Sequence, residues 1–190
     1  MKDIGITFKA QMVRAILDGR KTQTRRIIEG QQPNGGEGFH KTHPYHRPDG
    51  NWVWCLGSGM GVGDPFNCEY KIGSLLWVRE SWRTTRVLDT CKTINLAHGA
   101  AIEYEAGGSN LASGNIVHDL GKLRSARIMP RWASRILLEI KNVRVERLRD
   151  ISEEGAIAEG VTPSIAGHDL DHLKFRAGFQ TLWESIHGAG

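Results

Sequence analysis

The alternation of apolar and polar residues predicts three short elements at the start of the chain. Alternate residues of segment 4–8 are apolar, which is typical of a strand with one buried face. Residues 9–18 carry apolar side chains at helical spacing, and Gly19 is well suited to end that helix. Residues 24–28 predict a second strand, on which Thr24 and Arg26 would point to one face and Arg25 to the other.

Apolar residues predict further elements later in the chain. They predict strands at 75–80, at 100–105 and at 136–147, the last and longest with a bulge at Asn142. Helical spacing predicts two further helices, 152–160 and 169–186. Ser152 is a favourable residue for the start of the first of these helices.

Residues 29–63 differ from the rest, because they are rich in Gly, Pro, Asn and His. They predict a loop-rich insertion, with a small strand at 52–54, inside a single domain of 190 residues. A helix set among short strands, without regular strand–helix alternation, predicts an α+β fold with a small, curved sheet or barrel. The histidines of the insertion match no zinc module, so we predict no metal site.

Composition restricts the class of protein. Hydrophobic residues make up 39% of the chain and charged residues 24%, as in soluble globular proteins. No apolar run approaches the ~20 residues of a membrane helix, and the first residues lack the apolar core of a signal peptide. Three cysteines without C-x-x-C spacing favour reduced thiols. We therefore predict a cytoplasmic protein without a membrane partner.

The positive charge is concentrated in one segment. The net charge is +4, and residues 119–149 contain nine lysines and arginines against three acids. Such a segment fits either a polyanionic or phosphate-bearing partner or a solvated strand surface, and charge alone leaves both open. The chain has no Gly-rich phosphate loop, no H-E-x-x-H and no G-x-S-x-G, so we predict no cofactor.

The stretch 19–26 is the first candidate for chemistry. Lys21 and Thr24 stand three residues apart, and a hydroxyl beside an amine can be a nucleophile with its base. Arg25 and Arg26 beside them could hold a phosphate or a polarised carbonyl. Glu159 is the second candidate, because a carboxylate at the end of the predicted helix 152–160 opposes the helix dipole.

Four motifs together resemble the ASCH domain, in its larger phage- and prophage-borne branch. They lie in order along the chain at residues 15–26, 76–80, 129–135 and 145–161. The resemblance implies a PUA-like small curved β-barrel with flanking helices. This branch usually closes the barrel with a further strand, whereas this sequence ends at Gly190, so two alternatives stay open: the chain is truncated, or this version lacks that strand and leaves a sheet edge open.

The resemblance also implies an activity. The small bacterial ASCH proteins that hydrolyse N4-acetylcytidine use a lysine, a threonine three residues later and a distant glutamate. These carry over onto Lys21, Thr24 and Glu159, and an arginine of the same motif carries over onto Arg26. The expected substrate-binding residues are Arg25, Arg26, Trp77, Glu80, Arg131 and Trp132, where Trp77 and Trp132, together with Trp82, are candidates to stack on a base.

Two catalytic assignments stay open. Lys21 can be the base if its pKa falls well below ~10.4, and both burial and the charge of Arg26 would lower that pKa. Alternatively, Glu159 is the proton shuttle, and Lys21 with Arg26 stabilises the oxyanion.

Two other functions also stay open. The chain could be an RNA- or nucleotide-binding module without turnover, in which arginines hold phosphates, namely Arg25, Arg26, Arg131 and Arg135. It could also be a metal-independent ribonuclease with Lys21 as the base. The expected partner is thus a modified nucleoside or RNA.

Overall fold

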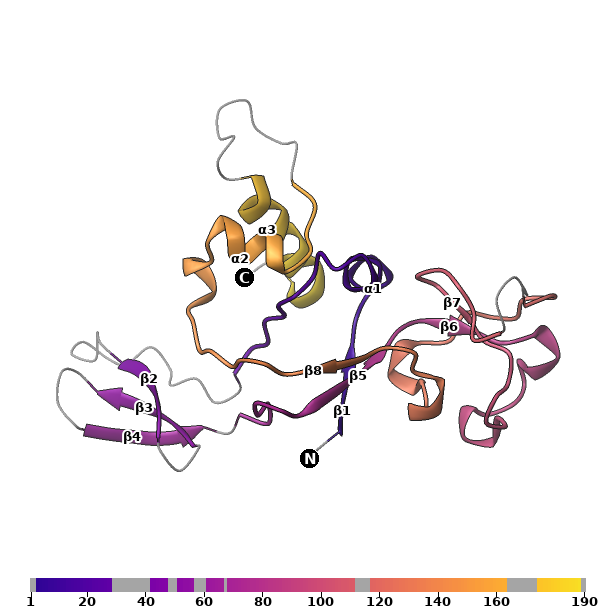
Figure 1. Ribbon diagram of the computed structural model, residues 1–190, viewed down its shortest axis with the longest axis horizontal. Coiled ribbons are helices and arrows are strands. Elements are labelled where there is room, and N and C mark those ends of the chain that lie inside the picture. Colours follow the sequence, from indigo (N-terminus) through magenta and orange to yellow (C-terminus); the bar gives the residue numbers. More distant parts are fainter. Residues whose placement is uncertain are drawn as a thin grey trace.

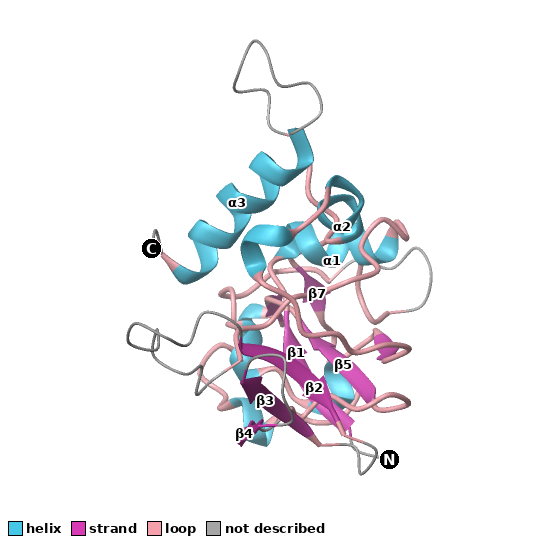
Figure 2. Cartoon of the chain, turned by 90° about the vertical axis from the view of Figure 1, so that its left-hand side faces the viewer, coloured by secondary structure: helices cyan, strands magenta, loops and turns pink. Residues whose placement is uncertain are grey.

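The computed structural model describes residues 3–28, 42–47, 51–56, 61–66, 68–111, 117–163 and 174–188. The described chain forms a mixed α+β fold with three small sheets. Figure 1 shows a central sheet between a three-stranded sheet at one end of the molecule and a two-stranded sheet at the other. Helices α1, α2 and α3 gather on one side of the strands, as Figure 2 also shows. The α+β class predicted from the sequence is confirmed.

The central sheet contains β1 (Asp3–Thr7), β5 (Leu75–Arg79) and β8 (Leu137–Glu139), in the order β1-β5-β8. β1 and β5 pair in parallel, with Ile4 opposite Leu76, and β5 pairs with β8 in antiparallel fashion. The strands predicted at 4–8 and 75–80 are therefore confirmed over Asp3–Thr7 and Leu75–Arg79, and in each of them every second residue is buried.

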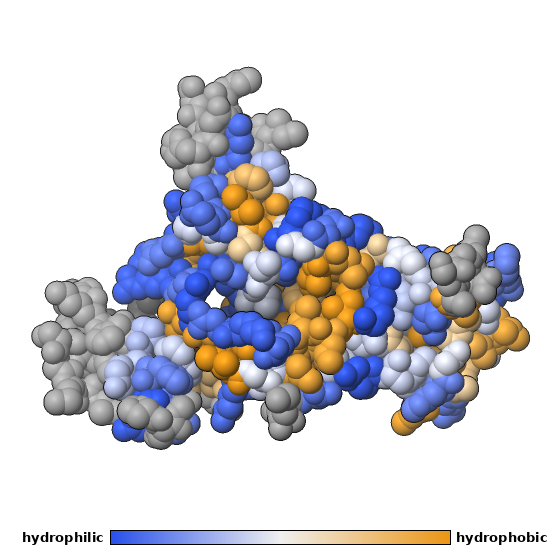
Figure 3. Space-filling view, viewed as in Figure 1, coloured by the Kyte–Doolittle hydropathy of each residue, from blue (hydrophilic) through white to orange (hydrophobic). Residues whose placement is uncertain are grey.

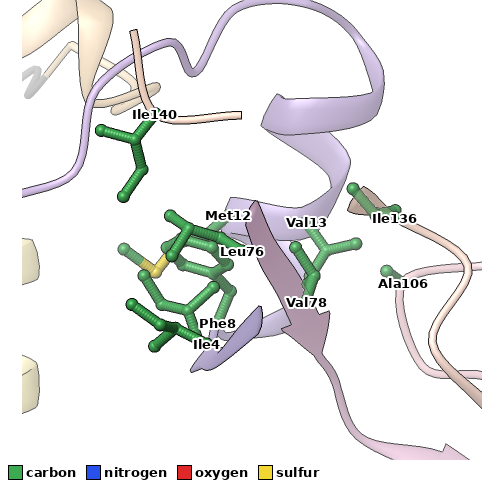
Figure 4. Packing of buried hydrophobic residues seen from close by; sticks show 10 residues of the cluster. Ile4, Phe8, Met12, Val13, Leu76, Val78, Ala106, Ile136 and Ile140 are labelled. Carbon is green, nitrogen blue, oxygen red and sulfur yellow. The ribbon is translucent and has the colours of Figure 1, made fainter. Parts of the chain in front are cut away.

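Helix α1 (Ala10–Leu17) covers the buried face of this sheet. Gly19, with φ +73°, follows it in the left-handed conformation that glycine adopts without strain. Figure 4 shows the resulting core. Its buried residues are Ile4, Ile6, Phe8, Met12, Val13, Leu76, Val78, Ala106, Ile136 and Ile140. Full burial of a side chain such as Val13 contributes roughly 1.5–3 kcal/mol, so this core fixes α1 against the sheet.

The predicted loop-rich insertion contains regular structure. β2 (Thr42–His46), β3 (Trp52–Leu56) and β4 (Gly61–Phe66) form an antiparallel sheet, which confirms the strand at 52–54 and corrects the loop predicted around it. The rings of Trp52 and Phe66 stack at 6.2 Å between centroids. Glycine and proline within and between these strands hid the alternation in the sequence.

The two-stranded sheet pairs β6 (Trp82–Arg83) with β7 (Glu103–Tyr104). The strand predicted at 100–105 is thus only two residues long. Just before β7, the side chain of Asn110 takes the place of a pairing strand. Its amide oxygen accepts from the Ile102 N–H, and its amide nitrogen donates to the Ala100 carbonyl. Five 3₁₀ turns complete the described chain: Arg86–Leu88, Thr93–Asn95, Ala126–Ile128, Arg131–Ala133 and Leu148–Asp150.

Helix α2 (Glu153–Ala158) begins where the sequence predicted, with the Ser152 hydroxyl accepting a hydrogen bond from the Gly155 N–H at 3.0 Å. Helix α3 (Lys174–His187) packs against it through Phe179. The final helix is therefore confirmed over 174–186, and residues 169–173 of the prediction lie outside the described residues.

One predicted strand is wrong, and another is shorter than predicted. Residues 24–28 pair with no strand, because the chain before them is docked on α2: the N–H groups of Thr22 and Gln23 both donate to the Ala158 carbonyl. Of the strand predicted at 136–147, only Leu137–Glu139 pairs with β5, and there is no bulge at Asn142. The polar residues beyond it bond side chains of segment 23–25 instead.

Pairing among the described strands forms open sheets, and none of these closes into a barrel. In the same part of the chain, no helix combines the length and the apolar character needed to cross a membrane.

Candidate active site

Lys21 and Glu159, 138 residues apart in the sequence, meet as a buried ion pair. The Nζ–Oε2 distance is 2.6 Å, and the two side chains are only 2% and 3% exposed. Nζ also donates to the carbonyls of Gln23 at 2.8 Å and of Glu159 itself at 2.9 Å. Three acceptors satisfy all three N–H groups of an ammonium, so this environment suits a cationic lysine.

Two glycines bring the partners together. Gly19 turns the chain after α1, and Gly160, with φ +76°, turns it after α2. A Cβ on Gly160 would lie 2.7 Å from Cβ of Lys21 and 2.8 Å from Cβ of Ala15, so only glycine allows this approach. The carboxylate of Glu159 follows the C-terminus of α2 as predicted, and the cations of Lys21 and Arg25 offset its unfavourable position there.

The pKa of Lys21 lies below the ordinary lysine value of 10.5, chiefly because burial disfavours the charged amine. Glu159 opposes this shift by stabilising the charge, whereas Arg26 and Arg25 add to it. The direction agrees with the expectation from the sequence.

Arg25 extends the pair into an ion-pair network. Its Nη1 lies 3.1 Å from Oε1 of Glu159, and its Nη2 lies 3.1 Å from Oε2 of Glu146. Oε1 of Glu146 in turn contacts Nε of Arg144 at 2.9 Å. Charges therefore alternate along the network, whose members are Lys21, Glu159, Arg25, Glu146 and Arg144. Both terminal nitrogens of Arg25 are engaged with carboxylates, which leaves the guanidinium poorly placed to hold a phosphate.

Thr24 and Arg26 lie beside the network. Nη1 of Arg26 donates to Oγ1 of Thr24 at 2.8 Å. The Arg26 guanidinium lies 5.3 Å from the centre of the Phe8 ring, and Nζ of Lys21 lies 5.6 Å from the same centre. The ring thus contacts both cations. Within the described chain, Thr24 forms no hydrogen bond with Lys21 or Glu159.

A cleft of about 670 Å³ lies alongside the network. Its charged lining residues are Arg25, Arg144 and Arg147 with Glu146, Asp150 and Glu154. Figure 3 shows an opening below α2, bordered mainly by hydrophilic residues. Because cations and anions are balanced, the lining suits a polar ligand better than a polyanion.

The structure does not bring the remaining predicted residues to this network. Glu80, 1% exposed, forms a bidentate ion pair with Arg135 at 2.9 and 3.0 Å. The guanidinium of Arg135 is therefore paired with a carboxylate, as that of Arg25 is. Its guanidinium lies 4.0 Å from the centre of the Tyr104 ring, in the part of the molecule that carries β6 and β7 (Figure 1).

The predicted aromatic residues also have other contacts. The Trp77 ring lies over Gly5 of β1 and contacts the guanidinium groups of Arg79 and Arg131. Trp132 stacks on His98 at 5.5 Å and packs against the cluster around the fully buried Trp82. Among the described residues, none of these tryptophans forms a ring contact with a member of the ion-pair network.

Sequence reasoning missed Glu146, Gln23 and Phe8. The one available signal was that Glu146 is among the three acids of the basic segment 119–149. Phe8 looked like an ordinary core residue, which it also is.

No cluster of three or more His, Cys, Asp or Glu side chains in the described ranges is placed to hold a metal ion. In comparisons with family models, curated proteins and solved structures, none matched this chain. Its function must therefore be argued from the site itself.

Proposed function

We propose that the protein is an amidohydrolase that removes an acyl group from the exocyclic amine of a modified nucleoside of the N4-acetylcytidine type. The observation that carries this proposal is the buried ion pair of Lys21 and Glu159, whose lysine also bonds the carbonyl of Gln23, the residue directly before Thr24. In this proposal the open sheets belong to a PUA-like barrel of the ASCH family, and the three residues keep the catalytic roles that the resemblance implies.

Stability alone is a weak reason for such a pair. Removing two charges from water costs several kcal/mol per ion, and apolar side chains of similar volume often serve a fold equally well. Ionisable groups with perturbed pKa values are concentrated at functional sites. A buried lysine with a lowered pKa, under the influence of two arginines and three residues before a threonine, therefore supports a chemical role.

In the proposed reaction, Oγ1 of Thr24 attacks the acyl carbon, and its proton passes to the Lys21–Glu159 pair. The Arg26 hydrogen bond to Oγ1 favours the alkoxide, because a cation stabilises developing negative charge. The tetrahedral oxyanion collapses, the carbon–nitrogen bond breaks, and the amine leaves with the proton. Water then hydrolyses the acyl-threonine to the free carboxylic acid. The three acceptors around Nζ favour a cationic Lys21, which is the protonation state required when Glu159 is the proton shuttle.

The test is the conversion of N4-acetylcytidine to cytidine by the wild type, Lys21→Ala and Thr24→Ala. Both variants should lose at least about 100-fold in kcat/KM, in the range typical of lost acid–base or nucleophilic groups. The matched controls, Thr22→Ala and Lys122→Ala, change exposed residues and should keep full activity. A folded wild type without turnover, or equal loss in a control, contradicts the proposal.

The alternative is an RNA- or nucleotide-binding module without turnover, or a metal-independent ribonuclease. One observation favours it: four exposed cations of segment 119–149 have no carboxylate partner among the described residues, namely Lys122, Arg127, Arg147 and Arg149. An RNA oligonucleotide should then bind with an affinity that falls steeply as salt rises. Cleavage of that RNA would indicate the ribonuclease, whereas nucleoside hydrolysis should respond little to salt.

A further inference from the structure

The ion-pair network reaches the cleft through Glu146, a residue that the predicted site did not include. We infer that Glu146 is a positioning residue: it holds Arg25, so that Arg25 keeps the Glu159 carboxylate in place against Lys21. This inference rests on the proposed function, because it assigns Glu146 a role in preparing the same pair for catalysis.

The first argument is the gradient of exposure along the network. The side chains of Lys21 and Glu159 are 2% and 3% exposed, and that of Arg25 is 17% exposed. Those of Glu146 and Arg144 are 42% and 50% exposed. The network therefore leads from the interior to the wall of the cleft, and Arg25 is its only link between the buried and the exposed parts among the described residues.

The second argument is the geometry of Arg25. A guanidinium is a rigid planar fork, so fixing one terminal nitrogen restricts the other. Nη1 bonds Glu159 and Nη2 bonds Glu146. The backbone of Arg25 belongs to no strand or helix, so its side-chain contacts hold the guanidinium in place. These contacts are the two carboxylates, the Phe179 ring at 5.7 Å and the close approach to Gly155.

The third argument is electrostatic. The charged groups that face Lys21 are Glu159, Arg25 and Arg26. Glu146 faces Arg25 and Arg144. Replacing Glu146 by Gln removes a negative charge from the network, so the cations nearby oppose the charge on Lys21 more strongly. Replacing Arg144 by Gln removes a positive charge and acts in the opposite sense.

The test compares Glu146→Gln and Arg144→Gln by two measurements. The first is the titration of Lys21 by NMR of ¹³C-labelled lysine, with its signal assigned by its loss in Lys21→Arg. The second is the pH profile of kcat/KM for N4-acetylcytidine. Glu146→Gln should move the Lys21 titration down by about half a unit, and Arg144→Gln should move it up. The pH profile should move in the same directions, and Glu146→Asp should restore it.

The matched control is Glu139→Gln, which removes the half-exposed partner of Lys141 elsewhere on the surface. This control should leave both measurements unchanged. A general loosening of the structure would move both network variants in one direction, and that result would overturn the inference, as would shifts below about 0.1 unit. If the wild type shows no turnover, the proposed function fails, whereas the NMR titration still decides whether Glu146 acts on Lys21.

Discussion

Replacing Lys21 by Met tests whether the buried pair exists as described. The substitution keeps most of the side-chain volume but leaves the Glu159 carboxylate, 3% exposed, with Arg25 as its one cationic partner among the described residues. It also removes the donor to two backbone carbonyls. The effect should therefore be much larger than that of an ordinary surface substitution.

The magnitude follows from these contacts. Removing one partner of a buried ion pair typically costs about 3–5 kcal/mol, and Arg25 should hold this case near the lower end. The two carbonyls add about 1 kcal/mol in total. We expect Lys21→Met to lower the free energy of unfolding by about 4 kcal/mol and Tm by roughly 8–16 °C. Adding Glu159→Leu should cost about 3 kcal/mol less than the sum of the single changes, because the two groups are directly coupled.

The assay is urea and thermal unfolding at neutral pH, with Lys141→Met as the matched control. Lys141 contacts Glu139 at the same 2.6 Å, but these side chains are 77% and 47% exposed. An exposed pair contributes at most about 1 kcal/mol, so the control should change stability little. If Lys21→Met lowers the free energy of unfolding no more than Lys141→Met does, Lys21 and Glu159 do not form the buried ion pair described above.

Three further predictions concern the pKa of Lys21, the packing of Gly5 against Trp77, and the ion pair of Glu80 with Arg135. Because the pKa of Lys21 is lowered in the folded state, folding releases its proton at pH values between the folded pKa and 10.5. The stability of the wild type relative to Lys21→Met should therefore rise with pH across that range, and a constant difference in urea unfolding would contradict this. Gly5→Ala should cost about 1–3 kcal/mol, since its Cβ would lie 2.6 Å from Trp77; in a Trp77→Ala background most of the cost should disappear, because only Arg79 Nε at 3.0 Å then lies close to it. Glu80→Gln should lower the unfolding free energy by about 2 kcal/mol, because it replaces a charged partner of Arg135 inside a buried contact. Glu80→Asp keeps the charge but shortens the side chain, so a similar loss in urea unfolding would show that the geometry of the contact matters as much as its charge.

The sequence predicted well those elements whose side chains are sorted by burial. β1, α1 and β5 each present one apolar face to a common core, so their hydrophobic period agrees with their structure. The start of α2 could also be predicted, because it depends on a local contact: the Ser152 hydroxyl accepts a hydrogen bond from the N–H of Gly155, three residues later. Lys21 and Glu159 were singled out from a motif and from a broken local rule, and they do lie together.

The errors arise where distant polar contacts decide the structure. Residues 24–28 were predicted to form a strand, but Arg25 and Arg26 bond Glu159 and Thr24 instead of facing opposite sides of a sheet. The alternation of apolar and polar residues in 136–147 continues past Glu139, but the pairing with β5 ends there. The later side chains of Arg144 and Glu146 belong to the ion-pair network instead. No local periodicity reports a partner more than a hundred residues away, so Glu146 could not be assigned from sequence alone.

The long sequence separation within the site has a consequence for the order of folding. Closing a loop of 138 residues costs about 4 kcal/mol of chain entropy before Lys21 and Glu159 can meet. The parallel pairing of β1 with β5 is also non-local, so the fold has a high contact order and should form slowly. The pair is then expected to assemble after the folding transition state. Substitutions in it should accelerate unfolding and leave the folding rate nearly unchanged, so that the chemistry of the site appears only when the chain has reached its final topology.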